Sequence, residues 1–149
     1  MTLAISTVCT SIAALTVDGV KIRDLDNIPP NATRLMPILF PIPSGEVSNI
    51  TATRESFGGG SSAKVNVEYD LNYLFLYDII GGGRTGLDWE QDRVEKWQAI
   101  CDAILSIDVI DGAVDVWPVG NMEFGTFDDP AGNHYLGCLM TFHVIEFWR

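Results

Sequence analysis

The sequence predicts an α+β fold, in which a mainly antiparallel β-sheet with long strands is packed by an N-terminal and a central α-helix. Two long segments, residues 65–77 and 135–147, alternate in side-chain direction as β-strands do, with an apolar face along each. Two other segments carry apolar side chains at helical spacing. The order helix, strands, helix, strands is typical of the α+β class. A length of 149 residues, 47% of them apolar, corresponds to a single domain over residues 1–149 with a core of its own.

The first sixty residues are predicted to hold one helix and three weaker strands. An amphipathic helix is expected over residues 2–15, where apolar side chains recur at helical spacing: Ile5, Val8, Ile12 and Leu15. Strands are expected at residues 20–23, at 34–40, where prolines favour a sheet edge, and more weakly at 47–57. The glycine-rich residues 58–62 predict a flexible loop.

The clearest periodicity in the sequence lies in residues 64–77. A strand of this length would measure about 45 Å, whereas a compact domain of this size is under about 40 Å across. The strand must therefore curl, break at a bulge, or project from the body. A projecting amphipathic strand needs a covering chain, so the apolar face is a candidate self-association surface: Val65, Val67, Tyr69, Leu71 and Tyr73.

The second half of the chain is predicted to begin with the central helix, over residues 88–105. Asp88 is a suitable N-cap and Gln91 completes a capping-box pattern. Asp111-Gly112 predicts a hairpin turn between residues 107–110 and 113–117. A short strand at 122–127 and a loop at 128–133 are expected before the closing strand, whose apolar face holds Leu136, Cys138, Met140, Phe142 and Val144.

The charge of the chain is strongly acidic and uneven. Nine basic against twenty acidic side chains give a net charge of −11, which argues against a surface that binds nucleic-acid phosphates or anionic lipid. Residues 1–60 hold four basic and five acidic groups, whereas residues 61–149 hold five and fifteen. The acidic segment, which includes Asp128 and Asp129, is interpreted as a solvated face or as a surface that repels a polyanion.

No residue pattern predicts catalysis, a cofactor or a metal site. Cys9, Cys101 and Cys138 lie far apart among apolar neighbours and are expected to be buried thiols. His134 and His143 have no cysteine pair near them in the sequence. We also expect no secretory signal and no membrane span, because residues 1–20 lack basic side chains and no apolar run reaches about 18 residues. The sequence thus predicts a soluble protein, made in a cytoplasm, that is not an enzyme.

Residues Gly81–Gly86 match the G-x-G-x-x-G pattern of dinucleotide-binding loops and lie between a predicted strand and a predicted helix. The preceding strand alternates polar and apolar side chains, unlike the doubly buried strand of those folds. Asp88 and Glu90 would also place negative charge where the phosphate binds. A flexible loop is the favoured interpretation, and a small nucleotide-binding enzyme stays open as an alternative.

The layout of the chain resembles the tail terminator and neck proteins of long-tailed bacteriophages. The resemblance lies in the Gly19–Pro30 segment, the proline-bounded segment Leu35–Pro41, a long tyrosine-rich strand, a central helix and a long closing strand. It implies a virion protein, assembled in the host cytoplasm, that forms a homo-oligomeric ring, commonly a hexamer. Such a ring joins the tail tube to the head–tail connector proteins and lets DNA pass without binding it. On this reading Asp128 and Asp129 would face the lumen or solvent.

Three other classes of function stay open at this point. Other head–tail adaptors and tail-tube subunits also need ring-forming sheet edges, so the sequence does not separate them from a terminator. The remaining alternatives are the nucleotide-binding enzyme and an interaction domain of unassigned role.

Overall fold

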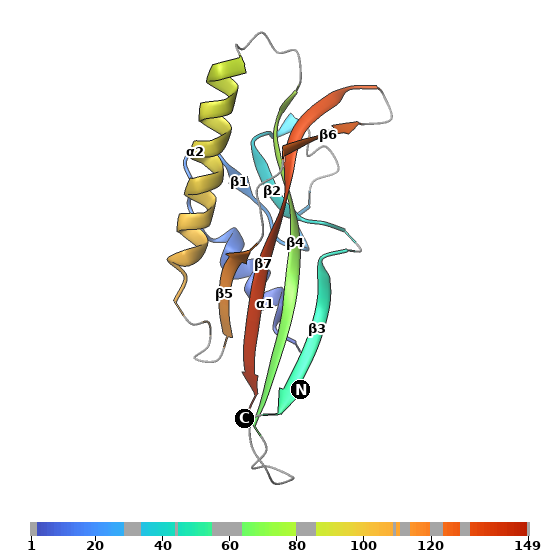
Figure 1. Ribbon diagram of the computed structural model, residues 1–149, viewed down its shortest axis with the longest axis vertical. Helices are drawn as coiled ribbons and strands as arrows, with labels where there is room; N and C mark the ends of the chain where they lie inside the picture. The colour runs from blue at the N-terminus through green and yellow to red at the C-terminus, as the bar shows by residue number, and fades with distance from the viewer. Residues whose placement is uncertain are drawn as a thin grey trace.

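The computed structural model describes residues 3–28, 34–43, 45–54, 64–79, 86–108, 110, 114–119, 124–128 and 132–148. It confirms an α+β fold dominated by a β-sheet (Figure 1). In chain order the elements are α1 (Ile5–Ala13), β1 (Lys21–Ile22), β2 (Ile38–Pro41), β3 (Val47–Arg54), β4 (Val65–Ile79), α2 (Gly86–Leu105), β5 (Val114–Val119), β6 (Phe124–Asp128) and β7 (His134–Trp148).

The described strands form one sheet built around the antiparallel pair of β4 and β7, each of 15 residues. On the far side of β4, β2 pairs with residues 73–76 and β3 with residues 65–71. On the far side of β7, β6 pairs with residues 134–138 and β5 with residues 141–146. β1 adds to β2 in parallel, and the other described pairs are antiparallel. Each long strand therefore carries two short partners in succession.

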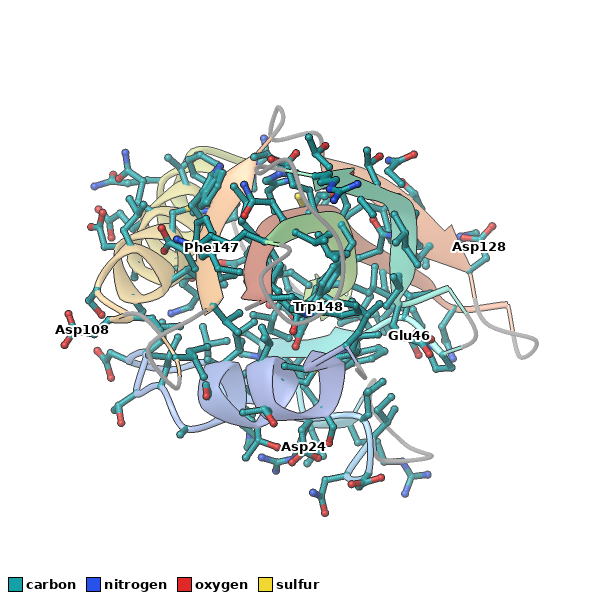
Figure 2. The ribbon with its side chains drawn as sticks, turned by 90° about the horizontal axis from the view of Figure 1, so that it is seen from below. Asp24, Glu46, Asp108, Asp128, Phe147 and Trp148 are labelled. Atoms are coloured by element: carbon teal, nitrogen blue, oxygen red, sulfur yellow. The ribbon has the colours of Figure 1, made fainter. Side chains whose placement is uncertain are left out.

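The length of the central strands is accommodated by curling and by a bulge. β4 and β7 twist around each other along the long axis of the molecule, and the view along that axis shows them as an arc (Figures 1 and 2). The register between them shifts between Leu76 and Asp78. A bulge increases the local twist of a strand pair. Of the three alternatives expected for so long a strand, two are present: β4 curls, and it has a bulge.

Both helices pack into one main core on the inner face of the sheet. Val8, Cys9 and Ile12 of α1 and Ile100 and Ile104 of α2 are fully buried there. The alternating inner side chains of β4 meet those of β7 across the register, and Tyr73 contacts Phe142 edge to face with ring centroids 5.0 Å apart. A smaller second core of Ile38, Phe40 and Leu76 lies at the β2 end.

The structure shifts several predicted boundaries. α2 begins at Gly86, so Asp88 lies in its first turn and is not the N-cap; Gln91 bonds to Glu95 one turn onward instead. The predicted hairpin reduces, in the described residues, to a single bridge between Ile110 and Val114, because residues 107 and 108 follow the end of the helix without joining the sheet. The glycine-rich residues 58–62 and 81–85 lie outside the described residues.

Candidate functional site

The predicted self-association face lies in the protein's own core, which corrects the expectation that a second chain covers it. Val67, Tyr69, Leu71 and Tyr73 are at most 3% exposed, and Val65 is half-buried. α1 and α2 cover this face within the same chain. The sequence pattern identified the apolar face correctly, but alternation alone does not distinguish a helix of the same chain from another subunit as the cover.

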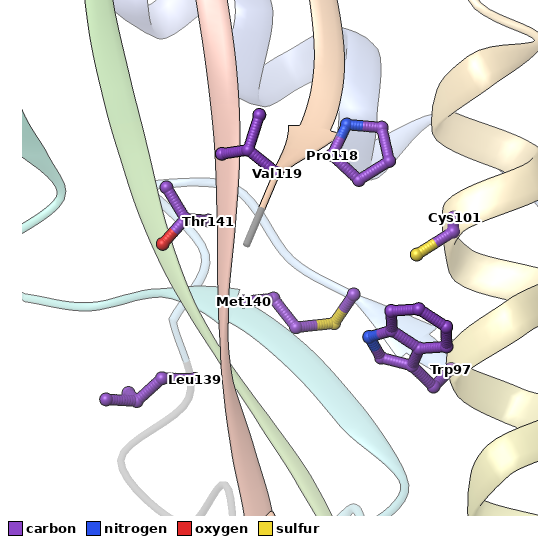
Figure 3. A pocket seen from close by; sticks show the side chains of 7 residues that line it. All are labelled: Trp97, Cys101, Pro118, Val119, Leu139, Met140 and Thr141. Carbon is purple, nitrogen blue, oxygen red and sulfur yellow. The ribbon is translucent and has the colours of Figure 1, made fainter. Parts of the chain in front are cut away.

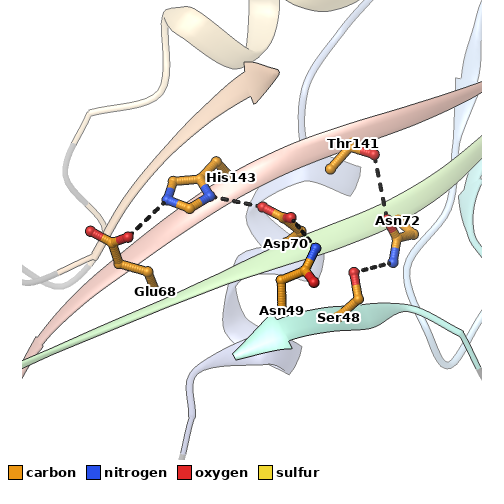
Figure 4. Close-up of polar contacts among 7 residues, drawn as sticks. All are labelled: Ser48, Asn49, Glu68, Asp70, Asn72, Thr141 and His143. Carbon is orange, nitrogen blue, oxygen red and sulfur yellow. Dashed lines mark hydrogen bonds and ion pairs between the residues drawn. The ribbon is translucent and has the colours of Figure 1, made fainter. Parts of the chain in front are cut away.

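The opposite, outer face of β4 and β7 carries a polar network centred on Asp70 (Figure 4). His143 Nδ1 lies 2.8 Å from Asp70 Oδ1, and His143 Nε2 lies 3.6 Å from Glu68 Oε2. Asn49 of β3 donates from Nδ2 to the second oxygen of Asp70 at 2.8 Å. The rings of Trp117 and His143 lie 5.0 Å apart. The network thus joins β3, β4, β7 and β5.

A second set of hydrogen bonds continues this network along the same face. Asn72 donates from Nδ2 to Ser48 Oγ at 3.0 Å and to the carbonyl of Gly45 at 3.1 Å. Thr141 Oγ1 donates to Asn72 Oδ1 at 3.4 Å. Side chains of β4 therefore fix the first residues of β3 to the body of the sheet.

Electrostatics favour an ionised Asp70. Burial by itself would raise the pKa of Asp70, but hydrogen bonds from Asn49 and His143 and the charge of His143 outweigh it, so the pKa lies below its ordinary value. The contact with Asp70 fixes one nitrogen of the His143 ring in this network. Its partner lies 73 positions away, and no local sequence signal links the two.

β3 leaves this network as an exposed strand. From Asn49 to Arg54 each residue is exposed, including Ile50 at 57%. The register to β4 shifts between Ser48 and Thr51, and Asn49 adopts a left-handed φ of 56° at this bulge. The residue pattern predicts a weak strand here, whereas the exposure of both its faces depends on the tertiary fold.

An apolar pocket of about 160 Å³ lies between α2 and the edge of β7 (Figure 3). Its lining side chains come from α2, from the end of β5 and from β7: Trp97, Cys101, Pro118, Val119, Leu139, Met140 and Thr141. Burial raises the pKa of the Cys101 thiol to about 11, so this thiol is protonated at neutral pH. Cys9 and Cys138 are buried, as predicted, whereas Cys101 is half-buried.

A polar pocket lies beside the N-terminal half of α2. The buried Tyr77 hydroxyl donates to Asp92, and Lys96 Nζ lies 3.7 Å from the same carboxylate. The backbone of Gly19, with a φ of 72°, lies against the Lys96 ammonium. These contacts join α2 to β4 and to the turn before β1, which is a structural role.

Of the two acidic residues predicted to face a lumen or solvent, the structure describes one. Asp128, at the end of β6, is exposed and lies 2.5 Å from His134 Nδ1, whereas Asp129 lies outside the described residues. Seen along the long axis, Asp24, Asp108 and Asp128 point away from the body on three different sides (Figure 2). These three carboxylates thus lie on different sides of the molecule.

Within the described part of the chain, no cluster of three or more histidine, cysteine or acidic side chains is arranged to hold a metal ion. None of the described helices has the length and apolar character that crossing a bilayer requires. The sequence was compared with models of protein families and with curated proteins, and neither comparison gives a match.

Proposed function

We propose that this protein is a structural component of a tailed bacteriophage particle, similar to the tail terminators that form a ring at the top of the tail tube. The observation that supports this best is β3. A chain that covers its own apolar core still presents six successive exposed residues on β3, a strand that pairs, among the described residues, with β4 alone. An exposed strand edge is a template for pairing with another chain.

The charge of the chain supports the second part of the proposal, the passage of DNA. A net charge of −11 and exposed carboxylates on different sides of the molecule repel phosphate from whichever side faces a channel. In this role the ring, commonly a hexamer, contacts the tail-tube protein and the head–tail connector proteins, and DNA moves through it without being held.

Native mass spectrometry at several concentrations, with negative-stain imaging of any large species, tests this proposal. The expected result is a closed ring with a central hole, built from 16.4 kDa subunits. A chain that stays monomeric at every concentration would contradict self-assembly. Thermal stabilisation by a dinucleotide would instead favour the nucleotide-binding alternative, since a ligand that binds the native state raises its stability.

A further inference from the structure

We propose that the polar network on the outer face of β4 and β7 binds a divalent transition-metal ion of the Zn²⁺ type, held by His143 Nε2 and Glu68 Oε2 (Figure 4). Asp70 positions the His143 ring and does not touch the metal. The site has two protein ligands, and water completes the coordination sphere. Such a site does not depend on the proposed ring, because both ligands belong to one chain.

Asp70 determines which nitrogen of the His143 ring is available to a metal. A carboxylate accepts hydrogen bonds and does not donate them, so the 2.8 Å contact with Asp70 Oδ1 places the ring hydrogen on His143 Nδ1. Asn49 holds the carboxylate in turn, because its Nδ2 donates to the second oxygen at 2.8 Å. Nε2 is then the nitrogen that offers a lone pair. In metalloproteins a ligating histidine commonly donates its other N–H to a carboxylate in this way.

The separation between His143 Nε2 and Glu68 Oε2 fits a metal that bridges them. The two atoms lie 3.6 Å apart, which is too long for a hydrogen bond. Two ligands at about 2.0–2.2 Å from a tetrahedral Zn²⁺ lie about 3.4 Å from each other. The separation in the structure is therefore within the roughly 0.2 Å that distances in metal sites vary. Imidazole nitrogen and carboxylate oxygen are both ordinary ligands of Zn²⁺.

The two ligands are held in place and are open to solvent. His143 on β7 is the register partner of Asp70 on β4 and of Trp117 on β5. The rings of Trp117 and His143 lie 5.0 Å apart, so the indole limits the movement of the imidazole. Glu68 precedes Asp70 by two positions and therefore lies on the same face of β4. The Glu68 side chain is 45% exposed and that of His143 is 23% exposed, so a hydrated ion can reach both.

The second histidine of the chain provides a comparison within the same molecule. His134 Nδ1 also lies against a carboxylate, that of Asp128. Among the described residues, however, a second carboxylate in ion-pair contact with the same ring is found at His143 and not at His134. Both rings have the outer carboxylate, but His143 alone has a second ligand opposite its other nitrogen in this part of the chain. His134 is thus the natural control.

Isothermal titration calorimetry with ZnCl₂ tests the site, in tag-free, reduced protein at about pH 8, where a proton on Nε2 competes little with the metal. The wild type should bind one Zn²⁺ ion. Glu68→Gln and His143→Gln each remove a ligand and should weaken binding by at least about 10-fold. Asp70→Asn should weaken it by about 10–100-fold although Asp70 does not touch the metal. His134→Gln should keep the wild-type affinity.

Thermal unfolding gives a second readout and checks the fold of each variant without metal. Glu68→Gln is the most informative change, because its side chain is exposed and the contact between Asp70 and His143 stays intact. A metal that binds the native state stabilises it, so Zn²⁺ at about 100 times the wild-type Kd should raise the wild-type Tm by about 5–10 °C. The Tm of Glu68→Gln should rise by no more than about half as much. Cys101→Ala, which removes the half-buried thiol, should behave as the wild type does.

Two results would overturn the site. A wild-type protein that binds no Zn²⁺ in the millimolar range would show that His143 and Glu68 form an ion pair of a protonated ring and nothing more. Zn²⁺ binding that Glu68→Gln and His143→Gln leave unchanged, or that His134→Gln or Cys101→Ala abolishes, would place the metal elsewhere. Each of these results can be obtained with a monomer or with a ring, so none of them decides the proposed function.

Discussion

Glu146 is a carboxylate inside the protein, 3% exposed, that holds the start of α1. The Ala4 N–H donates to Glu146 Oε1 at 2.8 Å, which satisfies a helix-end donor that no local side chain caps. The positive end of the helix dipole lies at the same place. A residue near the end of the chain therefore fixes one near its beginning.

Replacing Glu146 should lower the free energy of unfolding. The loss should be larger when the new side chain offers no hydrogen-bond acceptor to the Ala4 N–H. In Glu146→Leu the partly buried Ala4 N–H loses its acceptor, so the free energy of unfolding should fall by about 1–3 kcal/mol. Glu146→Gln keeps an acceptor oxygen and should lose less. Urea unfolding of the two variants measures the difference. A leucine variant as stable as the wild type would show that the bond to Ala4 contributes nothing.

Asp70 should make stability depend on pH in the acidic range. Because its folded-state pKa lies below the ordinary value of about 3.9, its contribution is present above about pH 4 and is lost as the pH falls through the folded-state pKa. Asp70→Asn should lower the free energy of unfolding at pH 7 by about 1 kcal/mol, and the difference from wild type should shrink toward pH 2.5. Asp108→Asn, at an exposed position, is the control. A difference that is constant with pH would contradict this role.

At the scale of elements, the sheet depends on a close contact where β6 crosses β7. A Cβ on Gly137 would lie 2.8 Å from the Phe75 carbonyl oxygen and 3.0 Å from the Phe127 ring. Gly125, its register partner on β6, has open space at the same position. The two glycines are register partners, so alanine substitutions at them test whether the close packing at Gly137 requires a residue without a side chain.

Gly137→Ala should therefore destabilise the protein by about 1–3 kcal/mol, since the backbone of β4 must move to admit the methyl group. Gly125→Ala should change stability by less than about 0.5 kcal/mol. Thermal or urea unfolding of both variants gives the comparison. Equal effects would indicate that the backbone of β4 at Phe75 and the ring of Phe127 both shift at little cost to admit the methyl group.

The elements predictable from sequence were those whose pattern is local and long. Alternation over residues 65–77 predicted β4, and the spacing of Ile5, Val8 and Ile12 predicted α1. Two other features were not predictable: the hydrogen bond between Asp70 and His143, and the burial of Tyr69 under the helices of the same chain. Both depend on contacts between segments that are far apart in the sequence. Periodicity fixes the face of a strand that is buried, but not the segment that buries it.

At the scale of the whole molecule, the sheet is organised around two long strands, each of which pairs with two short strands on its other side. β4 and β7 lie at the centre of the sheet, where each is paired on both sides, and both helices cover the inner face. The short partners of each long strand occur in succession, so β3 and β6 lie toward opposite ends of the long axis (Figure 1).

The charge of the whole molecule predicts that the assembled protein does not retain DNA. With a net charge of −11, it should give no mobility shift with double-stranded DNA even at about 50 mM salt, where phosphate contacts are strongest. The triple variant Asp24→Lys, Asp108→Lys, Asp128→Lys places positive charge on three sides of the body and should gain salt-sensitive retention. Retention by the wild-type protein would contradict passage without binding. If the triple variant assembles and gains DNA binding, the carboxylates of this chain are what keep the DNA free.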